Sequence, residues 1–369
     1  MNYQKIVVKF GTSTLTANTQ RLSIPRLFDL VRQVASLHQS GYQVILVTSG
    51  AVAAGREVLK YPELPRFIPA KQMLSAVGQP HLMSLYDQFL HMFKIPMAQV
   101  LLTREDLADR SRYLNARNTL SALLDQKIIP IINENDTVAT DEFRFGDNDA
   151  LSAMVATLIE ADLLILLTDQ GGLYTGDPHN DPNARLVPLV DEPQIPQYLW
   201  DAAGGSISGV GTGGMLTKLK AADLARRGGA TVGIARGGDT DILLHLAQGE
   251  NPGTRFTPIE SALESRKRYL LSGIEAISAR ICIDEGAARA LKRSGSLLPV
   301  GITCVEGEFK RGDTVKVLSP SGKEIALGMV NYDSKDVETC ARHKSSEIES
   351  LLGFTFGDEV IHRNNLLML

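Results

Sequence analysis

The sequence has little cysteine and no long apolar run. Its three cysteines, Cys282, Cys304 and Cys340, are odd in number and widely spaced. This pattern excludes a disulfide framework and a CxxC metal site, and it is typical of a reducing compartment. No run of about 18 apolar residues occurs, so we expect no segment to span a membrane. The sequence therefore predicts a cytoplasmic protein.

The sequence also lacks an excess of charge. Its 369 residues include 38 Lys and Arg against 42 Asp and Glu, a formal net charge of −4. This balance gives no bulk attraction to nucleic acid or to an anionic membrane. The first residues lead into the strand-like run KIVVKF, without the pattern of a secretory leader. A chain of this length is expected to form two domains.

Up to about residue 257, apolar strand-like runs alternate with segments of helical periodicity. Continuous apolar strands separated by helices predict an α/β fold, in which a mostly parallel sheet is covered on both faces. The ligand of such a sheet lies outside the carboxyl ends of the strands. The expected strands are Lys5–Phe10, Val44–Val47, Met97–Leu102, Ile128–Ile132, Leu163–Leu167 and Ala230–Ala235, and the expected helices include Tyr113–Gln126, Ala150–Glu160 and Met215–Arg227.

A smaller second domain is predicted after the α/β region. We expect a first domain at 1–257, a linker at 258–275 and a second domain at 276–369. Short strand-like pieces separated by glycine turns predict a β-rich module there. From Glu275 to Leu369 the chain has 12 Lys and Arg against 14 Asp and Glu, so the charge of this module is near −2.

Polar motifs follow the first two predicted strands. Lys9 lies near the end of the first strand, before Gly11, and a lysine there is costly unless it meets an anion. Ser49 leads into a helix of small residues, whose free N–H groups suit a carboxylate or a phosphate. The alternatives are a lysine that reaches solvent at the rim of the sheet, and small residues that serve only helix–sheet packing.

Two acidic, amide-rich motifs come next. Asn133–Val138 closes the strand IIPII. Its amides and carboxylates can hold the ammonium and carboxylate groups of an amino acid, although Asn and Asp are also common in turns. Asp147–Asp149 begins a helix, and N-capping explains at most one of its acids. At least one of its three side chains is therefore expected to point into a site.

Two further segments suit a nucleotide. Thr168 and Asp169 end a strand where a base or ribose can lie, although a plain turn is nearly as good an explanation. Residues 208–218 form a glycine-rich loop that leads into a helix with Lys218 in its first turn. Neither the dinucleotide fingerprint nor the Walker A pattern fits this context. Such a loop can nevertheless wrap phosphates with N–H groups while the lysine adds charge.

Together these motifs predict phosphoryl transfer. In that chemistry the protein mainly positions the reactants and neutralises developing charge. None of the seven histidines lies in the motifs, so no general base is apparent. A carboxylate acceptor, with a pKa of about 4, is already ionised at neutral pH and needs none. The missing base therefore favours formation of an acyl phosphate.

The motifs carry a family resemblance. VVKFGTS, VTSGAVAAGR, INENDTV, FGDNDALSA, LLTDQGGLYTGDP and GTGGMLTKLKAA resemble the amino acid kinase family, most closely its members that phosphorylate free glutamate for proline synthesis. The likeness extends to about residue 257, and residues 276 to 355 resemble a PUA domain. The resemblance implies the three-layer αβα amino acid kinase fold, with ATP as donor and L-glutamyl 5-phosphate as product.

The resemblance also implies residue roles. Lys9 and Lys218 would stabilise the transferring γ-phosphoryl group, and Asp149 would hold both lysines. Glutamate would be bound by Ser49, Asp136 and Asn148, with Asp136 facing its α-ammonium group. The nucleotide would be bound by Lys9, Thr168, Asp169, Thr212, Gly213, Gly214, Met215, Leu216, Thr217 and Lys218. Mg²⁺ would be held mainly by ATP and water, with no dedicated protein ligand.

Other interpretations stay open. The acceptor could be aspartate, N-acetylglutamate, carbamate or a nucleoside monophosphate. PUA domains occur in RNA-binding proteins, but a module charge near −2 disfavours RNA. Lys9, Lys218 and Asp149 disfavour a regulatory relative without catalysis. From the resemblance we also expect feedback inhibition by proline, a homo-oligomer and transient contact with a glutamyl phosphate reductase.

Overall fold

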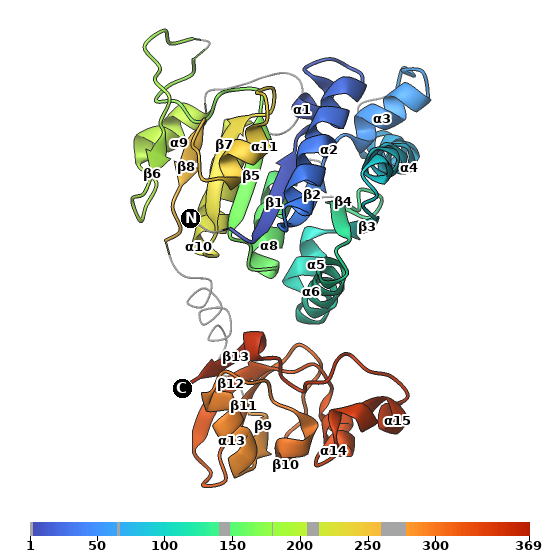
Figure 1. Cartoon of the computed structure of the whole chain (residues 1–369), viewed down its shortest axis with the longest axis vertical. Coiled ribbons are helices and arrows are strands. Elements are labelled where there is room, and N and C mark those ends of the chain that lie inside the picture. Colours follow the sequence, from blue (N-terminus) through green and yellow to red (C-terminus); the bar gives the residue numbers. More distant parts are fainter. Residues whose placement is uncertain (1–2, 65–66, 140–147, 179, 205–213, 260–277) are drawn as a thin grey trace. The chain divides into compact units, whose positions relative to one another are not determined.

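The computed structural model describes residues 3–64, 67–139, 148–178, 180–204, 214–259 and 278–369. The chain divides into two compact units, residues 1–107 with 117–262 and residues 108–116 with 263–369 (Figure 1). The predicted limits of the first domain, linker and second domain stay predictions. Among the described residues, no helix is long and apolar enough to cross a membrane.

An eight-stranded sheet, in the order β3-β4-β2-β1-β5-β7-β8-β6, forms the centre of the described part of the first unit. Neighbouring strands are parallel except for β7 and β8, which are antiparallel. This confirms the predicted mostly parallel α/β sheet. The strands are β1 Lys5–Phe10, β2 Gln43–Thr48, β3 Met97–Leu102, β4 Ile129–Glu134, β5 Leu163–Thr168, β6 Leu189–Val190, β7 Thr231–Arg236 and β8 Thr254–Phe256.

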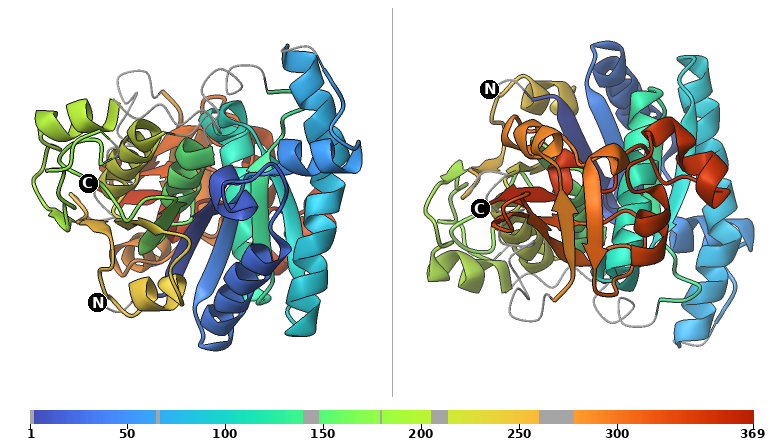
Figure 2. Two further views of the ribbon diagram at one scale, coloured as in Figure 1. Left: turned by 90° about the horizontal axis from the view of Figure 1, so that it is seen from above. Right: turned by 90° about the horizontal axis from the view of Figure 1, so that it is seen from below.

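Helices cover both faces of this sheet (Figure 2). Alternate residues of β1, namely Ile6, Val8 and Phe10, share a hydrophobic core with α2, α4 and α11. Because side chains alternate along a strand, Lys9 faces the opposite layer, where α8 and α10 pack together. In the described part of the chain up to residue 247, the helices are α1 Thr12–Thr16, α2 Ile24–Gln39, α3 Ala51–Val58, α4 Ile68–Met92, α5 Arg104–Ala108, α6 Arg110–Asp125, α8 Asn148–Leu158, α9 Gln197–Gly204, α10 Met215–Arg227 and α11 Ile242–Ala247.

Two glycines let α3 and α4 pack closely. A Cβ at Gly55 would lie 1.9 Å from the carbonyl oxygen of Leu74, and one at Gly78 would lie 1.9 Å from that of Ala51. No side chain fits at such a backbone-to-backbone contact. The contact fixes α4 beside α3, which begins where β2 ends.

The second unit has a separate five-stranded sheet in the order β10-β9-β11-β12-β13. The predicted β-rich module is therefore confirmed as a fold. Its elements are β9 Arg280–Ile283, α13 Glu285–Lys292, η2 Pro299–Gly301, β10 Ile302–Glu306, β11 Thr314–Leu318, β12 Glu324–Met329, α14 Ser334–Cys340, η3 Ser345–Glu347, α15 Ile348–Leu352, η4 Arg363–Asn365 and β13 Leu366–Met368.

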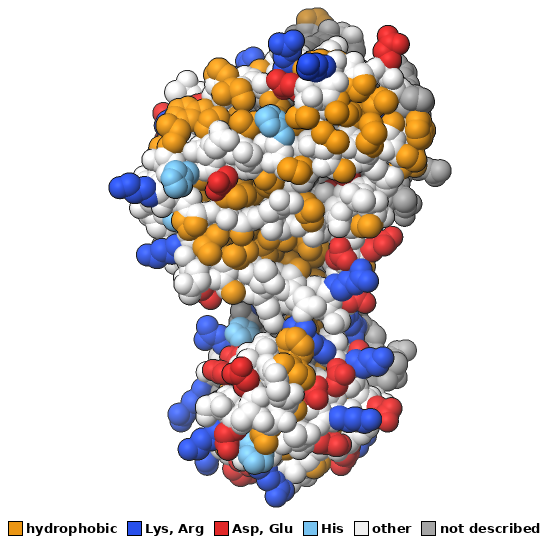
Figure 3. All heavy atoms as spheres, turned by 90° about the vertical axis from the view of Figure 1, so that its right-hand side faces the viewer, with side chains coloured by type: hydrophobic (Ala, Val, Ile, Leu, Met, Phe, Trp, Pro, Cys, Tyr) orange, Lys and Arg blue, Asp and Glu red, His pale blue; other side chains and the backbone are white. Residues whose placement is uncertain are grey.

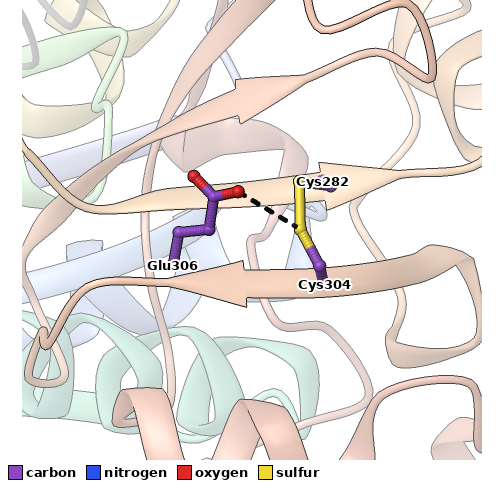
Figure 4. A group of neighbouring side chains, drawn as sticks. All are labelled: Cys282, Cys304 and Glu306. Carbon is purple, nitrogen blue, oxygen red and sulfur yellow. Dashed lines mark hydrogen bonds between the residues drawn. A yellow bond between two sulfur atoms is a disulfide. The ribbon is translucent and has the colours of Figure 1, made fainter.

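One disulfide bond joins two strands of this second sheet. Cys282 on β9 lies directly opposite Cys304 on β10, and their sulfurs are bonded (Figure 4). The cysteine count predicted no disulfide framework, and this single bond was not anticipated. The pairing depends on the register of two antiparallel strands, which a separation of 22 residues does not reveal.

Candidate active site

A buried group of three charged side chains lies at the centre of the first unit. Lys9 Nζ is 2.6 Å from Asp149 Oδ1, and Lys218 Nζ is 3.2 Å from Asp149 Oδ2. The hydroxyl of Thr217 donates to the same Oδ2 at 2.7 Å. Lys9 is 4%, Lys218 5% and Asp149 0% exposed. Three residues that the sequence assigned to catalysis therefore lie together.

Three elements bring these side chains together. Lys9 is the fifth residue of β1, Asp149 the second of α8 and Lys218 the fourth of α10. An acid is favourable in the first turn of a helix, but a lysine there opposes the positive end of the helix dipole. The helix dipole therefore does not favour the positive charge of Lys218, but a bound anion would.

The electrostatics of the centre favour an anionic ligand. Burial raises the pKa of the Asp149 carboxyl, but the charges of Lys218 and Lys9 and the hydrogen bonds from Lys9 and Thr217 outweigh it, so this pKa lies well below its usual range. The carboxylate is therefore ionised at neutral pH. With both lysines protonated, the three charged side chains carry a net charge of +1. A buried positive charge of this kind suits a phosphate.

A relay of amides lies next to Asp149. The Asn148 amide nitrogen donates to the main-chain oxygen of Thr48 at 2.7 Å, to Ser49 Oγ at 3.0 Å and to Asn133 Oδ1 at 3.0 Å. Asn133 in turn donates to Gln79 Oε1 at 2.7 Å. The structure thus joins Ser49 and Asn148, both assigned to glutamate by the resemblance. It adds Gln79 on α4, which the sequence motifs did not contain.

Asp136, the third residue assigned to glutamate, follows β4. Its carboxylate accepts a hydrogen bond from the hydroxyl of Ser75 on α4. Another α4 residue, Tyr86, is hydrogen bonded to the Thr48 hydroxyl at 2.6 Å, and burial raises its pKa. Ser75, Gln79 and Tyr86 recur at helical spacing, and this polar stripe was the available signal for them.

The residues assigned to the nucleotide are only partly described. Thr168 ends β5 and its hydroxyl donates to Asp169 Oδ1 at 3.0 Å. Gly214 is the N-cap of α10 and has no side-chain cap, and Met215, Leu216, Thr217 and Lys218 form the first turn. Thr212 and Gly213 lie outside the described residues, as does the Phe145–Asp147 part of the FGDND motif.

In the described residues, the one cluster of at least three His, Cys, Asp or Glu with ligand atoms within 4.8 Å is Cys282, Cys304 and Glu306. It belongs to the second unit, and Figure 4 shows the Glu306 carboxylate beside the two sulfurs. Because these sulfurs are bonded to each other, neither is a thiolate that could bind a metal.

Two family models match the chain. The model of the amino acid kinase family matches residues 4–236, and the model of the PUA domain matches residues 279–352. Among solved structures, the crystal structure of UMP kinase from Ureaplasma parvum gives a TM-score of 0.48 at 14% identity, over 70% of this chain and 100% of that one.

Curated relatives match over their whole length. The glutamate 5-kinase of Shewanella amazonensis is 52% identical over 100% of this chain and 96% of its own. Those of Herpetosiphon aurantiacus and Deinococcus radiodurans are each 48% identical over 99% of this chain, covering 98% and 100% of theirs. The chain belongs to the amino acid kinase family, among the glutamate 5-kinases, and carries a PUA domain.

Proposed function

We propose that this chain transfers the γ-phosphoryl group of ATP to the side-chain carboxylate of L-glutamate, giving L-glutamyl 5-phosphate and ADP, the first step of proline biosynthesis. The names of its full-length relatives support this activity. The structural observation that carries it is the buried Lys9–Asp149–Lys218 centre, which adjoins a network of hydrogen-bonded amides that begins at Asn148.

The residues fit a bound triphosphate. Two buried lysines meet at Asp149, and α10 begins at an N-cap glycine without a side-chain cap, so its first N–H groups suit phosphate oxygens. Mg²⁺ bound to ATP would neutralise phosphate charge. Because the described part of the first unit contains no cluster of ligating side chains, we assign no protein ligand to it.

Each charged residue has a separate task in the transfer. A carboxylate oxygen of glutamate attacks the γ-phosphorus as the bond from that phosphorus to the ADP oxygen breaks, and no proton has to move. Lys9 and Lys218 neutralise charge on the transferring group. Asp149 does not touch the substrate in this scheme but holds both ammonium groups in position.

We assign the acceptor to the amide network that begins at Asn148, the neighbour of Asp149 in the chain. The Ser49 hydroxyl would orient a carboxylate of glutamate, whereas Asn148 Oδ1, which has no partner in the described part of the chain, would accept from the ammonium group. Asp136 would pair with the α-ammonium group, and its hydrogen bond from Ser75 fixes the carboxylate for that role. With this assignment the attacking carboxylate would approach the two lysines, because Asn148 and Asp149 are adjacent residues.

The test of the function is ATP turnover with magnesium and hydroxylamine, which traps an acyl phosphate as a hydroxamate. We expect ADP release and hydroxamate in equal amounts with glutamate, and neither with aspartate, N-acetylglutamate or no acceptor. Equal rates with another acceptor, or ADP release without hydroxamate, would contradict the proposal.

Lys218→Ala tests the proposed role of one lysine. Turnover is expected to fall by at least about 100-fold, because each positioned donor at developing charge contributes on that scale. The matched control is Lys220→Ala, since Lys220 lies on the same helix but is exposed. Turnover near that of the unaltered chain in Lys218→Ala would remove the residue from the mechanism.

Among the proposed partners, a second copy of this chain is the one that a structural observation supports, and we propose a homo-oligomer. Exposed apolar side chains gather on the face of the first unit that includes α4 and the edge strand β3 (Figure 3); they include Ile68, Met73, Met92 and Leu101. Large patches of this kind mark interfaces. Light scattering should give a mass above 40.1 kDa. Inhibition by proline, contact with the reductase, a cytoplasmic location and weak or absent RNA binding stay predictions.

A further inference from the structure

Helix α4 contributes a buried amide to the glutamate side of the site. Gln79 is 8% exposed, and its Oε1 accepts a hydrogen bond from Asn133 at 2.7 Å. No sequence motif of the site includes this glutamine. A buried amide must pair both its oxygen and its nitrogen to offset the loss of water.

The direction of the relay determines which end of Gln79 is used. The main-chain oxygen of Thr48 can only accept, so the Asn148 atom 2.7 Å from it must be the amide nitrogen. Asn133 therefore turns its oxygen toward Asn148 and its nitrogen toward Gln79. Gln79 accepts through Oε1, which leaves Nε2 as a donor at the end of the relay.

Two buried atoms of this relay lack partners in the part of the chain that the structure describes. One is the donor Gln79 Nε2 and the other is the acceptor Asn148 Oδ1. An amino acid offers the complement of both, because its carboxylate accepts and its ammonium donates. The unmatched pair is therefore an observation that points to a zwitterionic ligand.

The packing of α4 fixes the main chain at Gln79, whose side chain is buried. Its neighbour Gly78 lies against the main chain of α3, where a Cβ would be 1.9 Å from the oxygen of Ala51. The helix is thus fixed where Gln79 reaches Asn133. A group held by a packed helix is more precisely placed than one on a loop.

We propose that Gln79 is a further glutamate-binding residue, whose Nε2 donates a hydrogen bond to a carboxylate of the acceptor while its Oε1 fixes the direction of the Asn133–Asn148 relay. This inference rests on the proposed function. It adds a specificity-determining contact from α4 to those of Ser49, Asp136 and Asn148.

Two variants separate the two ends of the amide. Gln79→Glu keeps an oxygen to accept from Asn133 but removes the donor, and Gln79→Met removes both without adding charge. Gln88→Glu is the matched control, because Gln88 lies on the same helix, is exposed and bonds only to Ser84 among the contacts of the described chain. Binding of L-glutamate and of ADP to the full chain is measured by calorimetry, with circular dichroism to verify folding.

The expected result is at least about tenfold weaker glutamate binding in both Gln79 variants, since a hydrogen bond to a charged group is lost. ADP binding and the Gln88→Glu control should be unchanged. If only Gln79→Met weakens glutamate binding, Gln79 serves only to orient the Asn133–Asn148 relay. If only Gln79→Glu weakens it, the added negative charge is the cause. If neither variant weakens it, Nε2 of Gln79 donates to water instead of glutamate. Each of these results, or an equal loss of ADP binding, overturns the inference.

The two proposals can fail separately. If the unaltered chain binds no glutamate, the proposed function is wrong and this inference falls with it. If the unaltered chain binds glutamate and both variants bind it equally well, only the role of Gln79 is wrong. If the Gln79→Glu variant does not fold, the test uses Gln79→Met alone. Its loss of glutamate affinity is then compared with any loss of ADP affinity.

Discussion

Replacing Asp149 with Asn tests the electrostatic centre directly. The side chain keeps its size but loses the charge that pairs with Lys9 and Lys218. Two ammonium groups, 4% and 5% exposed, are then left beside each other without their common carboxylate. We expect Asp149→Asn to destabilise the first unit and to stop turnover.

The size of the effect follows from the loss of one buried charge. Breaking a buried ion pair by removing one partner costs about 3–5 kcal/mol. Both ion pairs share the single carboxylate of Asp149, so we count this cost once and expect a destabilisation of about 3–5 kcal/mol.

Unfolding of the first unit can be followed through Trp200, the only tryptophan, which lies on α9. Urea titrations of Asp149→Asn should show the predicted loss, with turnover measured in parallel. The control is Asp87→Asn, since Asp87 lies exposed on α4, and it should cost no more than about 0.5 kcal/mol. A loss below about 1 kcal/mol in Asp149→Asn would refute the claim that its charge holds the two lysines.

Three further predictions follow from the same contacts. Because the pKa of Asp149 is lowered in the folded chain, its carboxylate contributes its full stabilisation above the unfolded pKa of about 4 and loses it as the pH falls below that value. In urea titrations, the difference in stability between the unaltered chain and Asp149→Asn should therefore shrink only below about pH 4. Gly78→Ala should destabilise the first unit by more than about 2 kcal/mol in the same assay, because its Cβ would meet main chain, whereas Gly204→Ala, with open space around it, should not. Tyr86→Phe should cost about 1 kcal/mol through the lost hydrogen bond to Thr48, again by urea titration.

The parts of the fold that repeat a simple period were predictable. The bounds of β1, β3 and α10 agree with those expected from the sequence, and the other expected strands differ by one or two residues at one or both ends. The short strands β6 and β8 were not predicted, because two or three residues carry no period. The antiparallel pairing of β7 with β8 depends on that missing strand.

The candidate site was predictable where strands end, whereas the contribution of helix α4 had only a weak signal in the sequence. Lys9, Ser49 and Asp136 follow or end strands, and parallel strands bring such residues to one edge of a sheet. Gln79 lies inside a 25-residue helix whose sequence is mostly apolar and contains Pro80. Nothing in one sequence shows which turn of that helix faces the strand ends.

The position of α4 explains why its polar residues belong to the site. Gly55 and Gly78 allow main chain to meet main chain, so α4 lies against α3 at a fixed level. At that level α4 directs Gln79 toward Asn133 and Ser75 toward Asp136, and each strand-end residue gains a hydrogen bond from a rigid support. One carboxylate therefore holds the charges of the lysine centre, whereas the residues assigned to the acceptor depend on a whole helix to direct their hydrogen bonds. Specificity for the amino acid should consequently be more sensitive to the packing of α3 against α4 than affinity for the nucleotide is.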